Sequence, residues 1–256
     1  MPLEIITIPC LSDNYAYLAH DAQSGDTAVI DIPEAAPILK AAAKRGWKIT
    51  HVLVTHHHWD HVGGLDEVLA TFPDARVFGA RADLERLPPL HVALDEGDTV
   101  SIGAETGTVM DVSGHTLGHI AYYFADSDVV FTADSLMALG CGRVFEGTKP
   151  QMWESLSKLA ALPGNTVVCS GHEYTQANAR FALTIEPDNP ALISRCKEID
   201  AARAAGNPTV PSLLSVELDT NPFLRAAIPS LQRHLGMDGA DPSQVFAEIR
   251  SRKDNF

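Results

Sequence analysis

Short apolar runs, and stretches where apolar and polar residues alternate, recur through the first two-thirds of the chain. They are rich in β-branched and aromatic residues, which favours strands. We predict strands at Leu3–Pro9, Tyr15–Ala19, Ala28–Ile32, Ile49–Thr55, Arg76–Phe78, Thr108–Val112, Ile120–Phe124, Val129–Thr132 and Thr166–Ser170. Three stretches between them, Pro33–Arg45, Gly63–Thr71 and Pro150–Ala161, have a helical pattern. This mixture predicts an α/β arrangement.

The pattern changes near residue 173, where strand-like runs largely stop. Tyr174–Ile185 and Pro190–Ala205 have a helical pattern, with Asn189 suited to cap the second of them. A last helix is predicted to start at Asp241-Pro242. We therefore predict two domains, an α/β domain over residues 1–173 and a helical domain over residues 174–256.

Composition narrows the class of protein. The 256 residues are 45% hydrophobic, enough for a sizeable core, and the net charge is -14. This acidic balance argues against nucleic-acid binding, which depends on Lys and Arg. We see no secretory signal and no apolar run long enough to span a membrane. The four cysteines match no metal-binding spacing, so we expect free thiols and a cytoplasmic protein, with a monomer as the default.

The run Thr55-His56-His57-His58-Trp59-Asp60-His61 follows a predicted strand. Side chains alternate faces in extended backbone, so His56 and His58 point the same way and His57 points away. Asp60 and His61 come after the chain turns toward a helix. Four ligands within six residues suit two adjacent metals better than one. Imidazole and carboxylate ligands favour Zn, Fe or Mn, with positions left open to water for catalysis.

Three further polar residues follow apolar strands. His115 lies between glycines, Asp134 follows Val129–Thr132, and His172 follows Thr166–Ser170. Functional residues gather at such strand ends. With the first run they make a set of five histidines and two aspartates. The remaining histidines His57, His20, His51, His91 and His234 have no such context, and we expect them to be ordinary core or surface residues.

These motifs resemble the metallo-β-lactamase superfamily, whose signature run is His56 to His61 here. Within it the chain resembles the hydroxyacylglutathione hydrolase (glyoxalase II) family. That resemblance rests on the segments Cys141–Thr148, Gly171–Thr175, Asn221–Arg225 and Arg250–Phe256. It implies a four-layer αββα metallo-β-lactamase sandwich with a C-terminal helical domain.

The resemblance also implies roles for individual residues. His56, His58 and His115 would hold one metal, Asp60, His61 and His172 the other, and Asp134 would bridge them. Arg143, Tyr174, Arg250 and Lys253 would contact the glutathione part of the substrate. The family commonly has Lys and Tyr where this chain has Arg143 and Phe145, so Phe145 lacks the hydroxyl that the resemblance would expect to bond to the substrate.

The implied reaction is hydrolysis of S-(2-hydroxyacyl)glutathione, with S-D-lactoylglutathione foremost, as in methylglyoxal detoxification. A metal-bridging hydroxide would attack the thioester carbonyl, with Asp60 and Asp134 as the catalytic carboxylates. Two divalent metals per chain are expected, zinc first, with iron and manganese as alternatives.

Four other functions are weighed against this one. A glutathione persulfide dioxygenase with a single iron fits the first domain but leaves the helical region with Arg250 and Lys253 unexplained. An exported β-lactamase would carry a signal, and a nuclease would carry less negative charge. A non-enzymatic metal-binding protein would leave the open coordination positions without a use.

Overall fold

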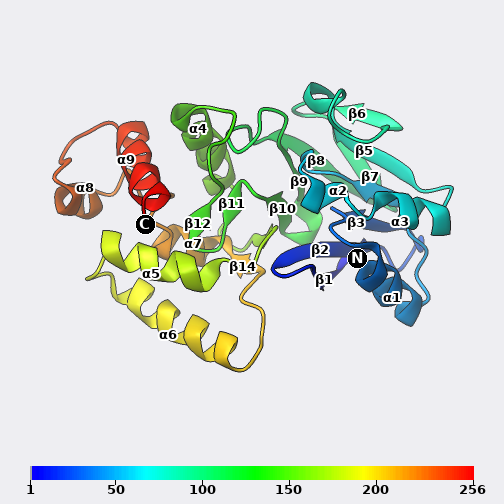
Figure 1. The fold of residues 1–256 in the computed structure, drawn as a ribbon, viewed down its shortest axis with the longest axis horizontal. Coiled ribbons are helices and arrows are strands. Elements are labelled where there is room, and N and C mark those ends of the chain that lie inside the picture. Colours follow the sequence, from blue (N-terminus) through cyan, green and yellow to red (C-terminus); the bar gives the residue numbers. More distant parts are fainter. Residues whose placement is uncertain (1) are drawn as a thin grey trace. The chain divides into compact units, whose positions relative to one another are not determined.

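A computed structural model describes residues 2–256 (Figure 1). The chain forms two compact units. Unit 1 comprises the chain up to Asp111 together with Leu117–Ala133, and unit 2 comprises Val112–Thr116 and Asp134–Phe256. This division follows spatial contacts, whereas the predicted boundary near residue 173 follows the change in sequence pattern. That boundary stays a prediction.

The first sheet of unit 1 has six strands in the order β1-β2-β3-β4-β5-β6. They are β1 (Glu4–Cys10), β2 (Asn14–His20), β3 (Thr27–Ile30), β4 (His51–Leu53), β5 (Arg76–Ala80) and β6 (Val92–Leu94). β1 to β3 pair antiparallel, and β3 to β6 pair parallel. The carboxyl ends of β3, β4 and β5 therefore meet at one edge of the sheet. Side chains that follow these three strands are brought together there.

Helices cover one face of this sheet (Figure 1). They are α1 (Ala35–Arg45) and α3 (Leu65–Thr71), while the short α2 (Trp59–Val62) follows β4. Ile38 of α1 and Val68 of α3 pack in one apolar cluster with Val52 and Val77 of the sheet. α1 ends at Gly46, whose φ of 71° is the left-handed conformation that glycine adopts readily. The helix predicted at Pro33–Arg45 is thus confirmed, at Ala35–Arg45.

The second sheet of unit 1 is antiparallel, in the order β7-β8-β9-β10. Its strands are β7 (Thr99–Ile102), β8 (Glu105–Asp111), β9 (Ile120–Phe124) and β10 (Val129–Ala133), and the single turn η2 (Ala125–Ser127) joins the last two. It packs on the first sheet, since the rings of Tyr17 and Phe131 lie 5.6 Å apart. The Tyr122 hydroxyl donates to the carbonyl of Val54 at 2.8 Å.

Unit 2 is mainly helical. Its helices are α4 (Lys149–Ala160), α5 (Thr175–Ile185), α6 (Pro190–Ala204), α7 (Leu214–Thr220), α8 (Pro229–Leu235) and α9 (Pro242–Asp254). It also has four short strands. β11 (Leu136–Met137) and β12 (Gly140–Cys141) form a hairpin, and β13 (Val167–Ser170) and β14 (Ser212–Leu213) form an antiparallel pair. α5 lies beside α6, and α4 packs on α9 through Trp153 and Phe246 (Figure 1).

Side-chain caps start the longer helices of unit 2. Thr148 and Gln151 form a reciprocal capping box at α4. Asn189 caps α6 and Asp241 caps α9, which confirms both predicted helix starts. Among residues 2–256, no helix is both long enough and apolar enough to cross a membrane.

Candidate metal centre and substrate site

The predicted ligand run occupies the loop after β4 and the helix α2. His56 is fully buried, and its Nε2 lies 3.2 Å from Nδ1 of His58. His57 is directed elsewhere, with its Nδ1 2.9 Å from Oδ2 of Asp83. The two outer histidines of the run thus share a direction that the middle one does not, as alternation in extended backbone predicts.

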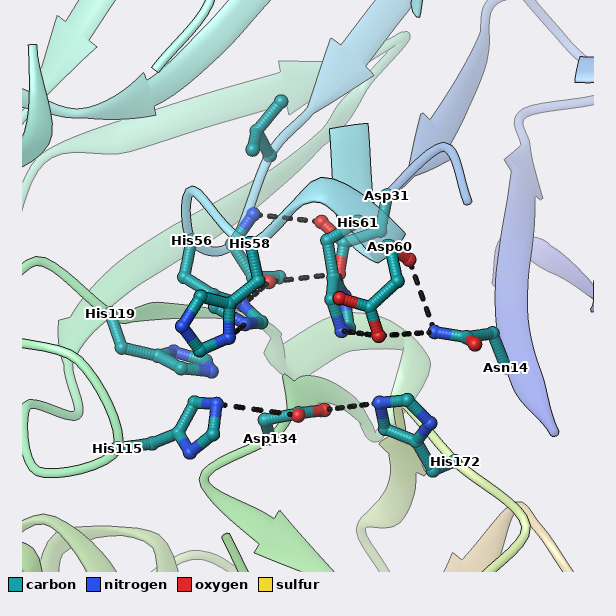
Figure 2. A network of polar contacts seen from close by, with 12 residues as sticks. Asn14, Asp31, His56, His58, Asp60, His61, His115, His119, Asp134 and His172 are labelled. Carbon is teal, nitrogen blue, oxygen red and sulfur yellow. Dashed lines mark hydrogen bonds and ion pairs between the residues drawn. The ribbon is translucent and has the colours of Figure 1, made fainter. Parts of the chain in front are cut away.

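Asp60 and His61 enter the same region from α2 (Figure 2). His61 is fully buried, and its Nε2 lies 3.8 Å from Oδ2 of Asp60. Asn14, at the start of β2, donates to the Asp60 carboxylate at 3.1 Å. The helical turn therefore adds a carboxylate and an imidazole to the imidazoles of the loop.

Asp31, which directly follows β3, organises this set. Its Oδ2 lies 2.8 Å from Nδ1 of His61, and its two oxygens accept from the backbone N–H and the hydroxyl of Thr55. The nitrogen and oxygen atoms that Asp31, His56 and His61 offer to a metal all lie within 4.8 Å of one another. We did not predict Asp31 from the sequence. In the structure Asp31 directly follows a buried strand, as Asp134 does, but the strand predicted from the sequence, Ala28–Ile32, contained it.

A further histidine, His119, also lies within this set. It is fully buried, and its ring stacks on the ring of His56 with centroids 4.6 Å apart. One of its ring nitrogens lies 3.1 Å from the Ile120 carbonyl. The contact with the backbone fixes the ring, and the stacking supports His56 from one side.

Unit 2 holds the other three predicted ligands, and all three are buried. Nε2 of His115 lies 3.4 Å from one oxygen of Asp134, and Nε2 of His172 lies 3.3 Å from the other (Figure 2). Nδ1 of His115 lies 2.8 Å from the carbonyl oxygen of Arg143. A carboxylate with an imidazole at each oxygen is a donor set suited to divalent metals.

The orientation of the histidine rings in both units also suits metal binding. His61 and His115 each have Nδ1 against a protein acceptor, and the opposite ring nitrogen, Nε2, faces the carboxylate of Asp60 or of Asp134. Metal-binding histidines in proteins usually have this arrangement, because the outer acceptor fixes the tautomer and the ring orientation. Within residues 2–256, the clusters of groups that could hold a metal contain no cysteine. Nitrogen and oxygen donors of this kind suit Zn, Fe or Mn.

The predicted substrate residues all lie in unit 2. Tyr174 stacks on His172 with ring centroids 4.7 Å apart, and 41% of its surface is exposed. Arg143 is exposed, and the ring of Phe145, itself 63% exposed, lies 5.2 Å from that of His115. Exposed side chains thus lie directly against the two histidines of this unit that are predicted metal ligands.

Arg250 and Lys253 of α9 differ in their surroundings. Arg250 is only 3% exposed, donates to the Cys141 carbonyl at 3.0 Å and pairs with Asp254 at 2.9 Å. The Lys253 amine is half-buried, 5.1 Å and 5.3 Å from the ring centres of Phe181 and Phe256. Burial, and after it the charges of Arg250, Arg180 and Arg143, together lower the pKa of Lys253 to about 8.

The segment Asn221–Arg225 has a structural role that the sequence did not reveal. The Asn221 amide donates to the carbonyls of Met137 and Gly140 in the β11–β12 hairpin. Glu217, fully buried, accepts from the backbone N–H of Leu139 in the same hairpin. The hairpin connects Asp134 to Arg143, so these side chains brace the segment between a predicted ligand and a predicted substrate contact.

Comparisons with known proteins identify the family of the chain. Residues 24–172 match the family model of the metallo-beta-lactamase superfamily, and residues 173–256 match the model named hydroxyacylglutathione hydrolase C-terminus. The hydroxyacylglutathione hydrolase of Ruegeria pomeroyi is 64% identical over 256 residues, covering 100% of both chains. That of Cereibacter sphaeroides is 62% identical, with the same coverage.

A solved structure, the BLEG-1 B3 metallo-beta-lactamase, superposes with a TM-score of 0.66 at 22% identity. It covers 86% of this chain and 99% of its own. The predicted fold class is confirmed as the metallo-β-lactamase fold with a helical C-terminal region. Because full-length relatives are so similar, the chain belongs to the hydroxyacylglutathione hydrolase family of the metallo-beta-lactamase superfamily.

Proposed function

We propose that this enzyme hydrolyses the thioester of S-(2-hydroxyacyl)glutathione, with S-D-lactoylglutathione as the preferred substrate, to glutathione and a 2-hydroxy acid. The observation that carries this proposal is the similarity to hydroxyacylglutathione hydrolases over the whole chain, the helical C-terminal region included. It favours thioester hydrolysis over the persulfide dioxygenase and over a metal-binding protein without activity. Methylglyoxal detoxification is the process in which this reaction would serve.

The proposed cofactor is a pair of divalent metals, zinc in the first place. His56, His58 and His115 would hold one ion, Asp60, His61 and His172 the other, and Asp134 would be shared. Support comes from the family and from the buried, converging donors within each unit. When bound, such a pair lowers the pKa of an associated water and polarises a carbonyl oxygen.

The protein's own carboxylates would orient the reacting groups. Asn14 holds Asp60 in place, and Asp134 is fixed between two imidazoles. Both carboxylates can accept hydrogen bonds from the attacking water and so aim its lone pair at the thioester carbon. The departing group is a thiolate with a free pKa of about 8.5, so it leaves without a dedicated general acid.

Substrate recognition would use Arg143, Tyr174, Arg250 and Lys253. Glutathione carries two carboxylates, and the cationic side chains of this unit complement them. Lys253 and Arg143 have the exposure that direct contact requires. Arg250 already binds the Cys141 carbonyl and Asp254, so it would act both on the substrate and on the shape of the site.

We also propose a cytoplasmic location, because the cysteines of the chain are present as thiols. Cys10, Cys141, Cys169 and Cys196 are all buried and stand outside any disulfide. Burial raises the pKa of the Cys10 and Cys141 thiols to about 11, so they are protonated and poorly reactive. Unpaired thiols are typical of a reducing compartment.

The test is hydrolysis of S-D-lactoylglutathione by the purified protein, with elemental analysis of the same sample. We expect turnover with close to two metals per chain. Asp134→Ala should lose metal and turnover together, whereas Asp74→Ala, at an exposed turn, should change neither. Metal-loaded wild type without thioesterase activity would overturn the proposal.

A further inference from the structure

Asp83 is a buried carboxylate that contacts the proposed ligand run without belonging to the set of proposed ligands. It ends the single turn η1 (Arg81–Asp83), which directly follows β5 in unit 1. Only 1% of its surface is exposed. Burial of a charged carboxylate is costly unless its oxygens have partners, so the partners of Asp83 indicate what it does.

The two oxygens of Asp83 have different partners. Oδ1 accepts from Nε of Arg86 at 3.0 Å and also from Nη2 of the same guanidinium. Oδ2 lies 2.9 Å from Nδ1 of His57, the middle histidine of the ligand run. Arg86 therefore balances the buried charge and fixes the carboxylate, whose other oxygen is directed at His57.

This contact is the counterpart of the one that Asp31 makes with Thr55. β4, which leads into the ligand run, lies between β3 and β5 in the sheet, and all three strands are parallel. Asp31 follows β3 and accepts from the backbone N–H and the hydroxyl of Thr55. Asp83 comes after β5 and holds His57. Carboxylates that follow both neighbouring strands thus hold the loop in which His56 and His58 lie.

His57 in turn packs against His58, a proposed ligand. Their ring centroids lie 4.9 Å apart, with the ring planes at 69°. His58 is only partly buried, whereas His56 on its other side is fully buried. The ring of His58 therefore depends on its neighbours for its orientation, and a His57 ring that is held by Asp83 limits how far it can turn.

Gly118 leaves room for the Asp83 carboxylate. A Cβ atom at position 118 would overlap with the carboxyl group of Asp83, although the backbone of Gly118 is not in the left-handed region. The next residue, His119, stacks on His56 with ring centroids 4.6 Å apart. A larger residue at position 118 would push the Asp83 side chain away from His57.

We propose that Asp83 is a positioning residue of the metal centre and acts through His57 on His58. The inference rests on the proposed function, in which His58 is a metal ligand. Outer groups that orient metal ligands typically contribute about 10- to 100-fold to metal affinity. Because the imidazole of His57 lies between Asp83 and the ligand, we expect an effect of roughly tenfold, at the low end of this range.

Competition between the zinc-loaded enzyme and a graded chelator measures this effect. Asp83→Asn keeps the volume of the side chain, but its amide nitrogen, a donor, would face either Arg86 or His57. We expect the first zinc to leave at a roughly tenfold lower chelator concentration than in wild type. The control Glu85→Gln removes a negative charge at an exposed position of the same segment and should retain zinc like wild type.

A double-mutant cycle separates positioning from a general loss of stability. His57→Phe keeps a ring beside His58 but has no nitrogen for Asp83 to bind. If Asp83 acts through His57, Asp83→Asn should weaken zinc binding about tenfold in the wild-type background and less than about twofold in the His57→Phe background. A general loss of stability would weaken binding equally in both.

Gly118→Ala provides a second route to the same displacement. It leaves Asp83, His57 and every proposed ligand in the sequence, yet it should move the carboxylate and repeat the zinc loss of Asp83→Asn. This variant keeps the inference testable if Asp83→Asn does not fold.

Two results would overturn the inference and leave the proposed function standing. One is wild-type zinc affinity in both Asp83→Asn and Gly118→Ala. The other is an equal effect of Asp83→Asn with and without His57, because Asp83 would then not act through that ring. A wild-type protein that binds no zinc would contradict the proposed metal centre itself, and the role of Asp83 with it.

Discussion

Asp31 holds the side chain of His61, one of the proposed metal ligands, in a fixed orientation. Both of its oxygens are occupied, by the backbone N–H and hydroxyl of Thr55 and by Nδ1 of His61. The carboxylate thereby links Thr55, which lies just after β4, to the imidazole of His61 in α2. Because His61 cannot turn while this contact holds, its Nε2 keeps the direction that ligation requires.

We expect Asp31→Asn to weaken metal binding by roughly 10- to 100-fold while the protein stays folded. Asparagine tolerates the φ of 55° found here, but its amide nitrogen, a donor, would replace one of the two accepting oxygens. It would then face either the backbone N–H of Thr55 or the hydroxyl of Thr55 and Nδ1 of His61. Metal retained after dialysis against graded chelator measures the effect, with the exposed Asp66→Asn on α3 as the control. Equal retention in Asp31→Asn and Asp66→Asn would contradict the positioning role.

Lys253 leads to a prediction about pH. Burial and three arginines lower its pKa to about 8, so the amine is charged below pH 8 and loses its charge as the pH rises through that value. If it binds a glutathione carboxylate, KM should be low at pH 7 and should rise by roughly tenfold once the amine is neutral.

The matched variants are Lys253→Arg and Lys253→Ala. Arginine stays charged throughout, so the ratio of the wild-type KM to that of Lys253→Arg should rise between pH 7 and pH 9. Ionisations elsewhere in the enzyme cancel in this ratio. Lys253→Ala should have a high KM at every pH and unchanged metal content. A ratio independent of pH would remove Lys253 from the substrate site.

At the scale of elements, the β11–β12 hairpin illustrates why short segments need side-chain support. Each of its strands has two residues, too few to be stable by pairing alone. Asn221 and Glu217, from a different part of unit 2, bond to its backbone. Glu217 is itself paired with Arg195, so its buried charge is balanced.

Asn221→Ala should lower the free energy of unfolding by about 2–4 kcal/mol, because two buried carbonyls lose their donor. Chemical denaturation measures this change, and Asn207→Ala at an exposed position should stay within about 0.5 kcal/mol of wild type. If the two variants unfold at the same denaturant concentration, Asn221 does not brace the hairpin. The same loss should lower turnover, since the hairpin joins Asp134 to Arg143.

The elements that sequence patterns predict are the long ones. The helix Pro190–Ala205 and the strand Ile120–Phe124 are found at Pro190–Ala204 and Ile120–Phe124. β6, β7, β11, β12 and β14 were not predicted, because runs of two to four residues are too short to show a period. α7 and α8, of seven residues each, were missed for the same reason. Their stability comes from contacts that only the folded chain brings together.

In the candidate metal site too, the sequence predicts only those residues that a local pattern marks. His115, Asp134 and His172 could be predicted because each stands out after an apolar strand, and the structure brings these three together. Asn14 could not, because its partner Asp60 is 46 residues away and nothing near Asn14 marks it. Residues that hold ligands in place depend on long-range contacts, and one sequence without an alignment does not reveal them.

At the scale of the whole molecule, the net charge of -14 opposes the approach of an anionic thioester. Recognition must therefore rely on local positive charge. The depressed pKa of Lys253 shows that Arg250, Arg180 and Arg143 lie close enough to it for their charges to interact. In the proposed substrate site, this cationic cluster would supply the positive charge that an acidic protein needs to bind glutathione, and metals in the proposed metal site would add to it.

Removing the metals should therefore affect both activity and stability. Ligands that bind only the folded state stabilise it by about 4 kcal/mol when present at a thousand times their Kd. For a chain of 256 residues, this corresponds to a melting temperature roughly 10 °C higher with metals than without them. Differential scanning calorimetry before and after chelation measures the shift, and added zinc should restore both turnover and melting temperature. A chelated protein that loses its metal yet keeps its activity and its melting temperature would show that these donors do not serve a resident cofactor.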